Sequence, residues 1–466
     1  LVCGTTGEKV VAHACRSFHD TRAFENIRYA LVRGAHNIPP HRDRPISRTP
    51  ETQSQAWIQS VDKVGWGRFQ PGSGRVFGMK KGSHSSAQQT MRAALLSRRA
   101  FLRSATAIGA AGLAAPMISR NAFSSSGDLN LLMWSDEFPD PVIPNFEKAT
   151  GILVNKTPFS QNDEQINKLQ ATGGEGFDLC QPTRNRAPQF QEIQVLAPFD
   201  LNRLKNASAL MPSMLESSTS LWTWDGGLYH LPHLWGSEAI SYRTDLYKGN
   251  LADLSYGSLW QDDVKGHTQG RGHSFLLGIG LWWDATGKMP SNRMLDAYKD
   301  EASFKKLWDP ILAFAIEHKS WVKQFWDSAD NTKSGLMEND VWIGQTWDGP
   351  PLTLKKEGKP VNYTSPKEGA IVWIDGLSLT KAAKNTEQVY EFINYLHTPE
   401  VAAQVADGSN YNPVVTGGDA LTSDAFKKNF QEAYPGDALK NIWPWPAEPA
   451  WYAEIRSQYV DQFKAA

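Results

Sequence analysis

The stretch that decides the fold begins with Leu-Asn-Leu-Leu-Met-Trp-Ser-Asp at residues 129–136. Its apolar run ends in Ser135 and Asp136, a pattern typical of a buried strand that is followed by a helix N-cap. Periodicity and breaker residues then predict four more elements: helix 141–150, strand 152–154, helix 161–171 and strand 177–181. This β-α-β-α-β order predicts a parallel sheet with helices on both faces. Ligands of such sheets bind at the carboxyl ends of strands, here residues 134–136 and 182–183.

The composition of the 466 residues is that of an ordinary globular protein, with 41% apolar and 21% charged residues. It excludes a coiled coil, a collagen-like chain, a disordered polyampholyte and a multi-span membrane protein. The net charge of −1 hides an asymmetry: residues 1–127 hold 18 Lys and Arg against 6 Asp and Glu, whereas residues 128–466 hold 30 against 43. An acidic body favours a cationic ligand over nucleic acid, although an acidic surface also serves solubility alone.

The basic front contains an export signal. Residues 97–103 read Ser-Arg-Arg-Ala-Phe-Leu-Arg, and an apolar stretch of small residues follows at 105–118. That stretch is shorter than the roughly 20 residues that a membrane-spanning helix needs. The paired arginines resemble the twin-arginine export signal of bacteria. We therefore expect a signal peptide at 91–123 and a periplasmic protein; the alternative is a chance arginine pair before a buried helix.

Residues 1–90 fit no domain and are expected to be unstructured, because they show no sustained apolar period. Export signals stand at N-termini, so we interpret this segment as a mis-called extension, with translation starting at Met91 or Met79. Cys3 and Cys15 would then be absent from the mature protein, which would keep only Cys180. Three cysteines are in any case too few for a disulfide framework.

Seven segments, in order along the body, carry a resemblance to a known family. The first, W-S-D-E-F-P-D-P-V-I-P-N-F-E-K-A-T-G-I at 134–152, resembles the first strand-helix unit of bacterial polyamine-binding periplasmic proteins, which bind putrescine or spermidine for ABC importers. The others are F-D-L-C-Q-P-T (177–183), Y-H-L-P-H-L-W-G (229–236), V-W-I-G-Q-T-W-D (341–348), P-K-E-G-A-I-V-W-I-D (366–375), Y-E-F-I-N-Y-L-H-T-P-E-V-A-A (390–403) and Asn410-Tyr411. The helix at 390–403 is expected to be continuous.

The resemblance implies the type II periplasmic-binding-protein fold, an α/β architecture of two lobes. Each lobe has a mostly parallel sheet with flanking helices, and the ligand binds in the cleft between the lobes. Carried onto this sequence, lobe one comprises 128–235 plus 376–420, and lobe two comprises 236–375 plus 421–466. The chain is expected to cross between lobes near 234–237, near 374–377 and after Tyr411. Hinges suit such positions because few residues absorb the backbone change.

The resemblance also implies a ligand site in which aromatic walls hold the methylene chain and carboxylates bind the ammonium ends. A cation over a Trp face gains about 0.5–2 kcal/mol, and a desolvated ammonium needs a charged partner. The positions that match are Trp134, Ser135, Asp136, Thr183, Asp348, Trp373, Asp375 and Tyr411. Asp348 and Asp375 follow the strand-like runs 341–343 and 370–372, so both are predicted to face the cleft and bind cationic nitrogen.

The sequence departs from the family pattern at three places. Glu137 stands in place of an aromatic residue, and Gln345 in place of a Trp, whose wall Trp347 could cover. The family's lobe-two glutamate, expected around 275–278, has no counterpart. Either Glu238 or Glu137 substitutes for it, or the second ammonium site is missing and the ligand is a monoamine, a basic amino acid or a betaine. We predict a cationic ligand that is not a standard long polyamine.

Other patterns leave three alternatives open. His230 and His233, with His267 and His273, could suggest a metal, but they lack a carboxylate at helical spacing. The Trp-rich segments 282–283, 321–326 and 443–451 could line the cleft of a carbohydrate receptor. A carboxylate pair such as Asp136 and Asp348 could serve an exported hydrolase. No catalytic motif or cofactor loop is present, so we expect no enzyme and no cofactor. The expected partners are the small cationic ligand and ABC permease subunits. We expect no binding to nucleic acid, and we expect the protein to be a monomer.

Overall fold

The computed structural model describes residues 127–466, so the predicted extension (1–90) and signal peptide (91–123) lie outside the described residues. Within residues 127–466, no helix has both the length and the hydropathy to cross a membrane. Cys180, the free cysteine of this part of the chain, is buried.

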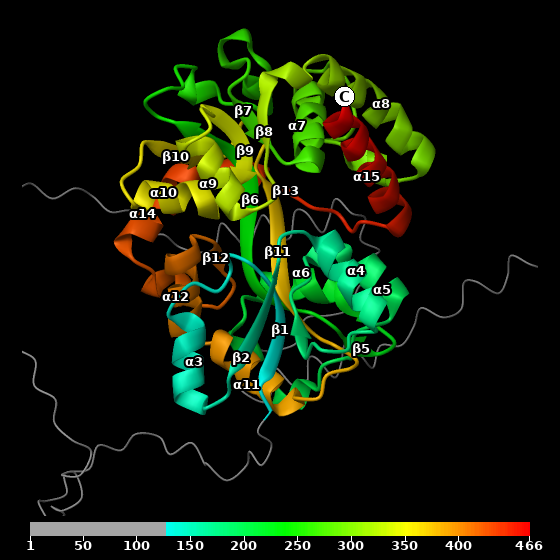
Figure 1. Ribbon diagram of the computed structural model, residues 1–466, viewed down its shortest axis with the longest axis vertical. Helices are drawn as coiled ribbons and strands as arrows, with labels where there is room; N and C mark the ends of the chain where they lie inside the picture. Colours follow the sequence, from blue (N-terminus) through cyan, green and yellow to red (C-terminus); the bar gives the residue numbers. More distant parts are fainter. Residues whose placement is uncertain (1–126) are drawn as a thin grey trace, which may run out of the picture. The chain divides into compact units, whose positions relative to one another are not determined.

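The predicted β-α-β-α-β alternation is confirmed at the start of the described chain (Figure 1). Strand β1 pairs in parallel with β2 on one side and β3 on the other. Both helices between these strands end at a left-handed glycine, Gly151 with φ 77° and Gly173 with φ 64°. The elements are β1 (Leu129–Trp134), α3 (Val142–Thr150), β2 (Val154–Phe159), α4 (Asn162–Thr172) and β3 (Leu179–Cys180).

The second strand begins at Val154, two residues later than predicted. The reason is the helix end: the Thr150 hydroxyl accepts a hydrogen bond from the Ile152 N–H at 3.1 Å, so Ile152 is still part of the turn. Pairing with β1 starts only when Leu129 N donates to Leu153 O at 2.8 Å. The third strand is also shorter than predicted and consists of Leu179–Cys180.

Two long antiparallel strands, β6 (Leu231–Arg243) and β11 (Ile371–Leu379), run through the middle of an 11-stranded sheet of order β2-β1-β3-β11-β6-β9-β7-β8. β11 continues the β1–β3 end of the sheet through antiparallel pairing with β3. β6 continues the other end, where β7 pairs in parallel with β8 and β9. The remaining strands are β7 (Thr268–Gly270), β8 (Val322–Phe325), β9 (Ile343–Trp347), β10 (Val361–Thr364), β12 (Asn412–Pro413) and β13 (Trp443–Pro444), with the hairpin β4 (Thr223–Trp224) and β5 (Gly227–Leu228).

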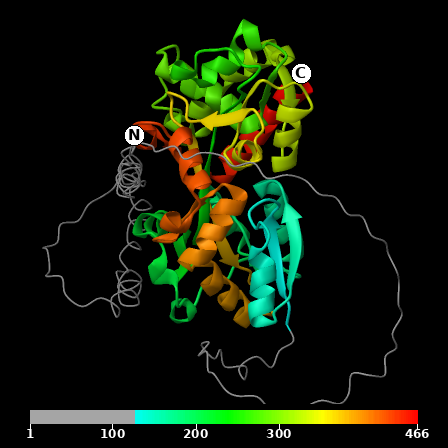
Figure 2. The same ribbon diagram turned by 90° about the vertical axis from the view of Figure 1, so that its left-hand side faces the viewer.

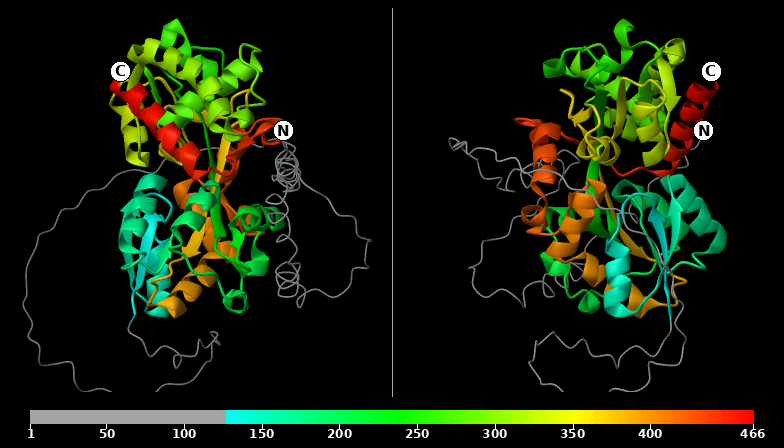
Figure 3. Two further views of the ribbon diagram at one scale, coloured as in Figure 1. Left: turned by 90° about the vertical axis from the view of Figure 1, so that its right-hand side faces the viewer. Right: turned by 60° about the vertical axis from the view of Figure 1, so that its left-hand side comes forward.

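Helices gather around the two ends of this sheet, and only a narrow set of strands connects the two groups (Figures 2 and 3). Around the β1–β3 end lie α3 and α4 with α5 (Ala187–Ile193), α6 (Pro212–Trp222), α11 (Thr386–Leu396), α12 (Pro399–Ser409) and α13 (Gly418–Leu421). Around the β7–β9 end lie α7 (Gly272–Ala285), α8 (Glu301–Glu317), α9 (Ala329–Met337), α10 (Gly349–Lys356), α14 (Asp424–Ala433) and α15 (Ala450–Ala465).

The connecting strands carry the features expected of crossings. The pairing of β11 with β6 shifts register between Asp375 and Gly376. β12 pairs with β6 at Leu234 and Trp235. These irregular and short pairings fall at the predicted crossings 234–237, 374–377 and after Tyr411. The exact lobe boundaries stay a prediction.

Three further element predictions were wrong in detail. The helix expected at 390–403 is two helices, α11 and α12, because Pro399 holds Thr398 in an extended conformation and starts a new helix. The strand-like run at 370–372 extends to Leu379, so Asp375 lies within β11 and not beyond its end. The run at 341–343 becomes strand only at Ile343.

Candidate binding site

A cavity of about 50 Å³ lies where β1, β9, β11 and the N-terminus of α7 approach one another. Nine of the twelve predicted site residues line it: Trp134, Asp136, Glu137, Thr183, Glu238, Trp347, Trp373, Asp375 and Tyr411. Ser135, Gln345 and Asp348 do not. The sequence therefore located the cavity, while the binding role of each residue stays a prediction.

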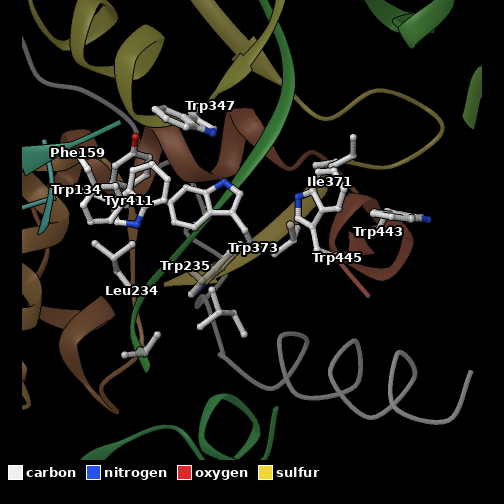
Figure 4. Packing of buried hydrophobic residues seen from close by; sticks show 14 of the residues in the cluster. Trp134, Phe159, Leu234, Trp235, Trp347, Ile371, Trp373, Tyr411, Trp443 and Trp445 are labelled. Carbon is white, nitrogen blue, oxygen red and sulfur yellow. The ribbon is translucent and has the colours of Figure 1, made fainter. Parts of the chain in front are cut away.

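Four aromatic rings line the cavity, three of them on strands and one just before a strand (Figure 4). Trp134 ends β1 and Trp347 ends β9, and their ring centroids lie 5.8 Å apart at an interplanar angle of 84°. Trp373 lies in β11 and meets Tyr411, just before β12, at 5.1 Å and 73°. Such faces attract a cation.

Three carboxylates, Asp136, Glu137 and Asp375, gather beside these rings; we call them the acid end. Tyr411 Oη donates to Asp136 Oδ2 at 2.5 Å, so Asp136 does not cap α3 as the sequence had predicted. Burial raises the pKa of Asp136. Burial, and then the charge of Asp375, raises the pKa of Glu137 well above its usual range. Burial also raises the pKa of Asp375 to about 6.

Backbone and amide contacts hold the acid end in place. Gln181, directly after β3, donates from Nε2 to Glu137 Oε2 at 3.0 Å and accepts from Trp134 N at 2.9 Å. Thr183 forms an isolated bridge with Asp375, and its hydroxyl accepts from Asn162 Nδ2 at 2.7 Å. The two strand ends chosen from the sequence, 134–136 and 182–183, thus meet at this point.

Another part of the cavity lining combines three arginines with three carboxylates; we call it the arginine end. Asp163 pairs with Arg186, and Arg456 Nη2 lies 3.5 Å from Asp163 Oδ2 and 2.9 Å from Glu448 Oε1. Burial acts to raise the pKa of Asp163, but the charges of Arg186 and Arg456 outweigh it and hold this pKa at about 2.

The third pair of the arginine end is Arg271 with Glu238. Arg271 Nη1 donates to Glu238 Oε1 at 3.3 Å, and the same oxygen accepts from Trp347 Nε1 at 3.0 Å. The Arg271 guanidinium lies 5.0 Å from the centre of the Trp347 ring. The sequence had offered Glu238 as a substitute for the missing lobe-two carboxylate. Glu238 lines the cavity, but its Oε1 is already paired with Arg271, so its role as the substitute carboxylate stays a prediction.

The prediction that Asp348 faces the cleft was wrong. Asp348 N donates to Ser237 O at 3.0 Å, and the side chain accepts from Tyr434 Oη at 3.3 Å and Asn412 Nδ2 at 3.4 Å. Burial raises its pKa to about 7. A Cβ added at Gly236 would touch both Trp373 and Asp348 Oδ1, so Asp348 lies behind the Trp373 wall.

Ser135 and Gln345 also lie outside the cavity lining. Ser135 N donates to Phe159 O at 3.2 Å, which continues the β1–β2 pairing beyond Trp134. Gln345 is fully buried within β9, and its Nε2 donates to Ser274 O at 2.8 Å. Trp347, two residues later, lines the cavity and so can supply the aromatic wall that Gln345 lacks, as the sequence had suggested.

Ten lining residues were missed: Gln161, Asn162, Asp163, Asn185, Arg186, Arg271, His273, Trp445, Glu448 and Arg456. Arg271 follows β7 directly, so the strand-end rule would have found it had this three-residue strand been recognised. Trp445 belongs to the Trp-rich segment 443–451 that the sequence had marked. The segments 282–283 and 321–326 do not reach the cavity.

The histidines have packing roles in three of four cases. His230 stacks on Trp222 with ring centroids 4.7 Å apart, His233 on Phe138 at 4.9 Å and His267 on Trp342 at 3.7 Å. Across residues 127–466, no three His, Cys, Asp or Glu side chains are grouped to hold a metal ion.

Comparisons with known proteins agree with this geometry. The family model described as bacterial extracellular solute-binding protein matches residues 142–432. The spermidine/putrescine-binding periplasmic protein of Escherichia coli (strain K12) is 26% identical over 361 residues, 76% of this chain and 97% of that protein. A putrescine/agmatine-binding protein of Pseudomonas aeruginosa is 24% identical over 357 residues, 74% of this chain and 94% of that protein.

A solved structure confirms the predicted fold. The spermidine/putrescine ABC transporter substrate-binding protein PotD from Streptococcus pneumoniae superposes with a TM-score of 0.57 at 22% identity. The superposition covers 72% of this chain and 98% of that one. The two-lobed type II periplasmic-binding-protein fold is therefore the fold of the described residues.

Proposed function

This chain belongs to the family of bacterial extracellular solute-binding proteins, and we propose that it captures a polyamine or a related small cation for an ABC importer. The proposal places the protein in the periplasm, where it binds its solute between two lobes and delivers it to the permease subunits. The twin-arginine signal at 91–123 would bring it there, and it would act as a monomer. The relatives named as spermidine/putrescine-binding and putrescine/agmatine-binding proteins support this class of ligand.

One observation carries the proposal: the acid end has no built-in counter-ion. All three carboxylates line the cavity, and Glu137 and Asp375 are 2% and 3% exposed, while Asp136 is partly buried. No ion pair joins Asp136, Glu137 or Asp375 to a Lys, Arg or His of the described residues. Asp375 Oδ1 accepts no hydrogen bond from residues 127–466 either. Buried anions need a cationic partner. A ligand ammonium enclosed by Trp134, Trp373 and Tyr411 would supply that partner.

Ligand capture also has a mechanical basis in the strands. Asp375 lies at the register shift between β11 and β6, where the two halves of the sheet connect. We propose that lobe one (128–235 plus 376–420) and lobe two (236–375 plus 421–466) close about this point. The ligand would favour the closed form because the cavity is lined from both ends of the sheet, by Trp134 on β1 and by Trp347 on β9.

The other functions considered from the sequence have less support. A hydrolase that uses Asp136 and Asp348 is not favoured, because Asp348 lies outside the cavity. A carbohydrate receptor would have no need of three unpaired carboxylates, which favour a cation.

A thermal-shift and calorimetric screen of the purified protein tests the proposal. Putrescine, spermidine, agmatine and simple monoamines are compared with neutral sugars of similar size. A tight ligand raises the midpoint temperature of unfolding by mass action. At a ligand concentration of 100 Kd, the free energy of unfolding increases by about 2.7 kcal/mol. A shift with at least one amine and none with the sugars supports the proposal. A shift with sugars alone would overturn it.

A further inference from the structure

The two ends of the cavity differ in what they leave for a ligand. At the acid end no Lys, Arg or His of the described residues forms an ion pair with a carboxylate, and burial raises the pKa of Asp136, Glu137 and Asp375, so a ligand cation would gain ion-pair partners there. At the arginine end Asp163, Glu238 and Glu448 each pair with an arginine. A second ligand ammonium at that end would approach three arginines, which repel it, and would compete with Arg271 for Glu238, whose Oε2 accepts no hydrogen bond within residues 127–466.

Arg271 is the residue that creates this difference. It occupies both features that an ammonium would use, the Glu238 carboxylate at 3.3 Å and the face of Trp347 at 5.0 Å. The Arg271 side chain is 13% exposed and lines the cavity. A guanidinium has five N–H donors, and Arg271 directs a single hydrogen bond to the rest of the described chain. Its remaining donors are available to a ligand in the cavity.

Further donors at the cavity lack an acceptor. The Nε1 groups of Trp134 and Trp373, which are 4% and 7% exposed, have no hydrogen-bond partner within residues 127–466. Buried donors of this kind need an acceptor to offset their desolvation. Residues 127–466 supply no such acceptor, so an acceptor group on the ligand would satisfy these two donors.

The N-terminus of α7 adds positive potential at the same place. Arg271 is its N-cap residue, no side chain of the described chain caps its first turn, and His273 on that turn lines the cavity. The partial positive charge of a helix N-terminus favours an anion. Burial, and then the charges of Arg271, Arg456 and Arg186, keep the pKa of His273 well below its usual range. His273 is therefore neutral at pH 7.

We propose that the cavity takes a solute with one ammonium group and one carboxylate, and that Arg271 determines this preference. The ammonium lies at the acid end, and the carboxylate accepts hydrogen bonds from Arg271 and the indole N–H of Trp373. This inference rests on the proposed function, since it concerns the same site, but it replaces the second ammonium of a diamine by an anion.

Four matched four-carbon probes test the inference by calorimetric titration of the full chain: 4-aminobutanoate, putrescine, butylamine and butanoate. We expect 4-aminobutanoate to bind at least about tenfold more tightly than each of the others, because only it offers both charges. Tighter binding of putrescine than of 4-aminobutanoate to the wild-type protein would overturn the inference.

Two substitutions then assign the preference to Arg271. In Arg271→Met, Glu238 is freed, so putrescine should gain and 4-aminobutanoate should lose about tenfold in affinity. Arg271→Lys keeps the charge and should keep the wild-type order. An unchanged ratio of the two affinities in a folded Arg271→Met, verified by circular dichroism, would reject the role of Arg271. The wild-type titrations decide the ligand class even if this variant does not fold.

Asp375→Asn separates this inference from the proposed function. One outcome is that amines bind, that Asp375→Asn abolishes their binding, and that 4-aminobutanoate binds no more tightly than the amines without a carboxylate. In that case the proposed function stands and this inference is wrong. If no probe and no amine binds, the proposed function itself is wrong.

Discussion

The acid end and the arginine end each contain three carboxylates, but they differ in their partners. At the arginine end, Asp163, Glu238 and Glu448 are paired with arginines. At the acid end, Asp136, Glu137 and Asp375 form no ion pair with a described residue, and burial raises the pKa of all three. The difference teaches that the number of acidic residues in a cleft does not define a cation site. Unpaired carboxylates define it.

The strongest test of this comparison removes a charge from the acid end. Asp375→Asn should weaken binding of a ligand ammonium by about 2–4 kcal/mol, because the cation then loses a buried partner. Asp348→Asn is the matched control, since Asp348 is equally buried but lies behind Trp373 and outside the cavity lining. Calorimetric titration should show little change in Kd for the control. Equal losses in both variants would contradict the distinction between them.

A second test uses pH. The pKa of Asp375 is about 6 in the ligand-free protein, so lowering the pH from 7 to 5 should weaken cation binding by about tenfold. The stability of the ligand-free protein should change in the opposite direction. A carboxyl whose pKa is higher in the folded state than in the unfolded chain holds its proton better when folded.

The stability of the ligand-free protein should therefore fall as the pH rises from the ordinary carboxyl range towards 6. Denaturant titrations with and without ligand would measure both trends. Affinity and ligand-free stability that rise together over this range would contradict the assignment.

A third test compares the same substitution at the two ends. Trp373→Leu removes a ring of the cation wall and should cost about 1 kcal/mol of binding, roughly fivefold in Kd. Trp445 lines the cavity beside His273, with ring centroids 5.6 Å apart. Trp445→Leu should leave the affinity for a simple monoamine within about twofold, because the ligand ammonium is not expected on this ring. A larger effect of Trp445→Leu would place the ammonium at the wrong end.

The smallest expected effect is at Asp163. Its side chain is 44% exposed although it pairs with Arg186 and Arg456. Because solvent screens such pairs, Asp163→Asn should lower the free energy of unfolding by about 1 kcal/mol or less. The affinity for a monoamine should stay unchanged. Denaturant unfolding and titration of the same variant check both statements, and a large loss of amine binding would show that Asp163 belongs to the cation site.

The sequence predicted the first half of the fold because its periods are local. The β1-to-β3 alternation follows from short apolar runs separated by helical spacing and by Gly151 and Gly173, whose left-handed conformations end the helices. Pro399 was present in the sequence as a breaker, but the pattern on both sides of it looked like one helix. The long strand β11 was underestimated because all nine of its residues are buried and show no alternation.

Part of the acid end was predictable for a similar reason, since Asp136 and Glu137 follow β1, whereas Asp375 lies within β11 and was found from its place in the matched segment 366–375. The arginine end was not. Arg186, Arg271 and Arg456 are far apart in the sequence and meet only through tertiary packing of α5, α7 and α15. Asp348 misled because a carboxylate after a strand can turn towards either face of the sheet. Only the contacts of Tyr434 and Asn412 show which one it takes.

The two long strands have a consequence for the way the molecule loses its structure. β6 and β11 pair with each other at the centre, and each also pairs with strands towards one end of the sheet. Neither group of strands can separate without exposing the backbone of this shared ladder. We therefore expect one cooperative unfolding transition in place of two, with the amide protons of the β6–β11 ladder the last to exchange with solvent.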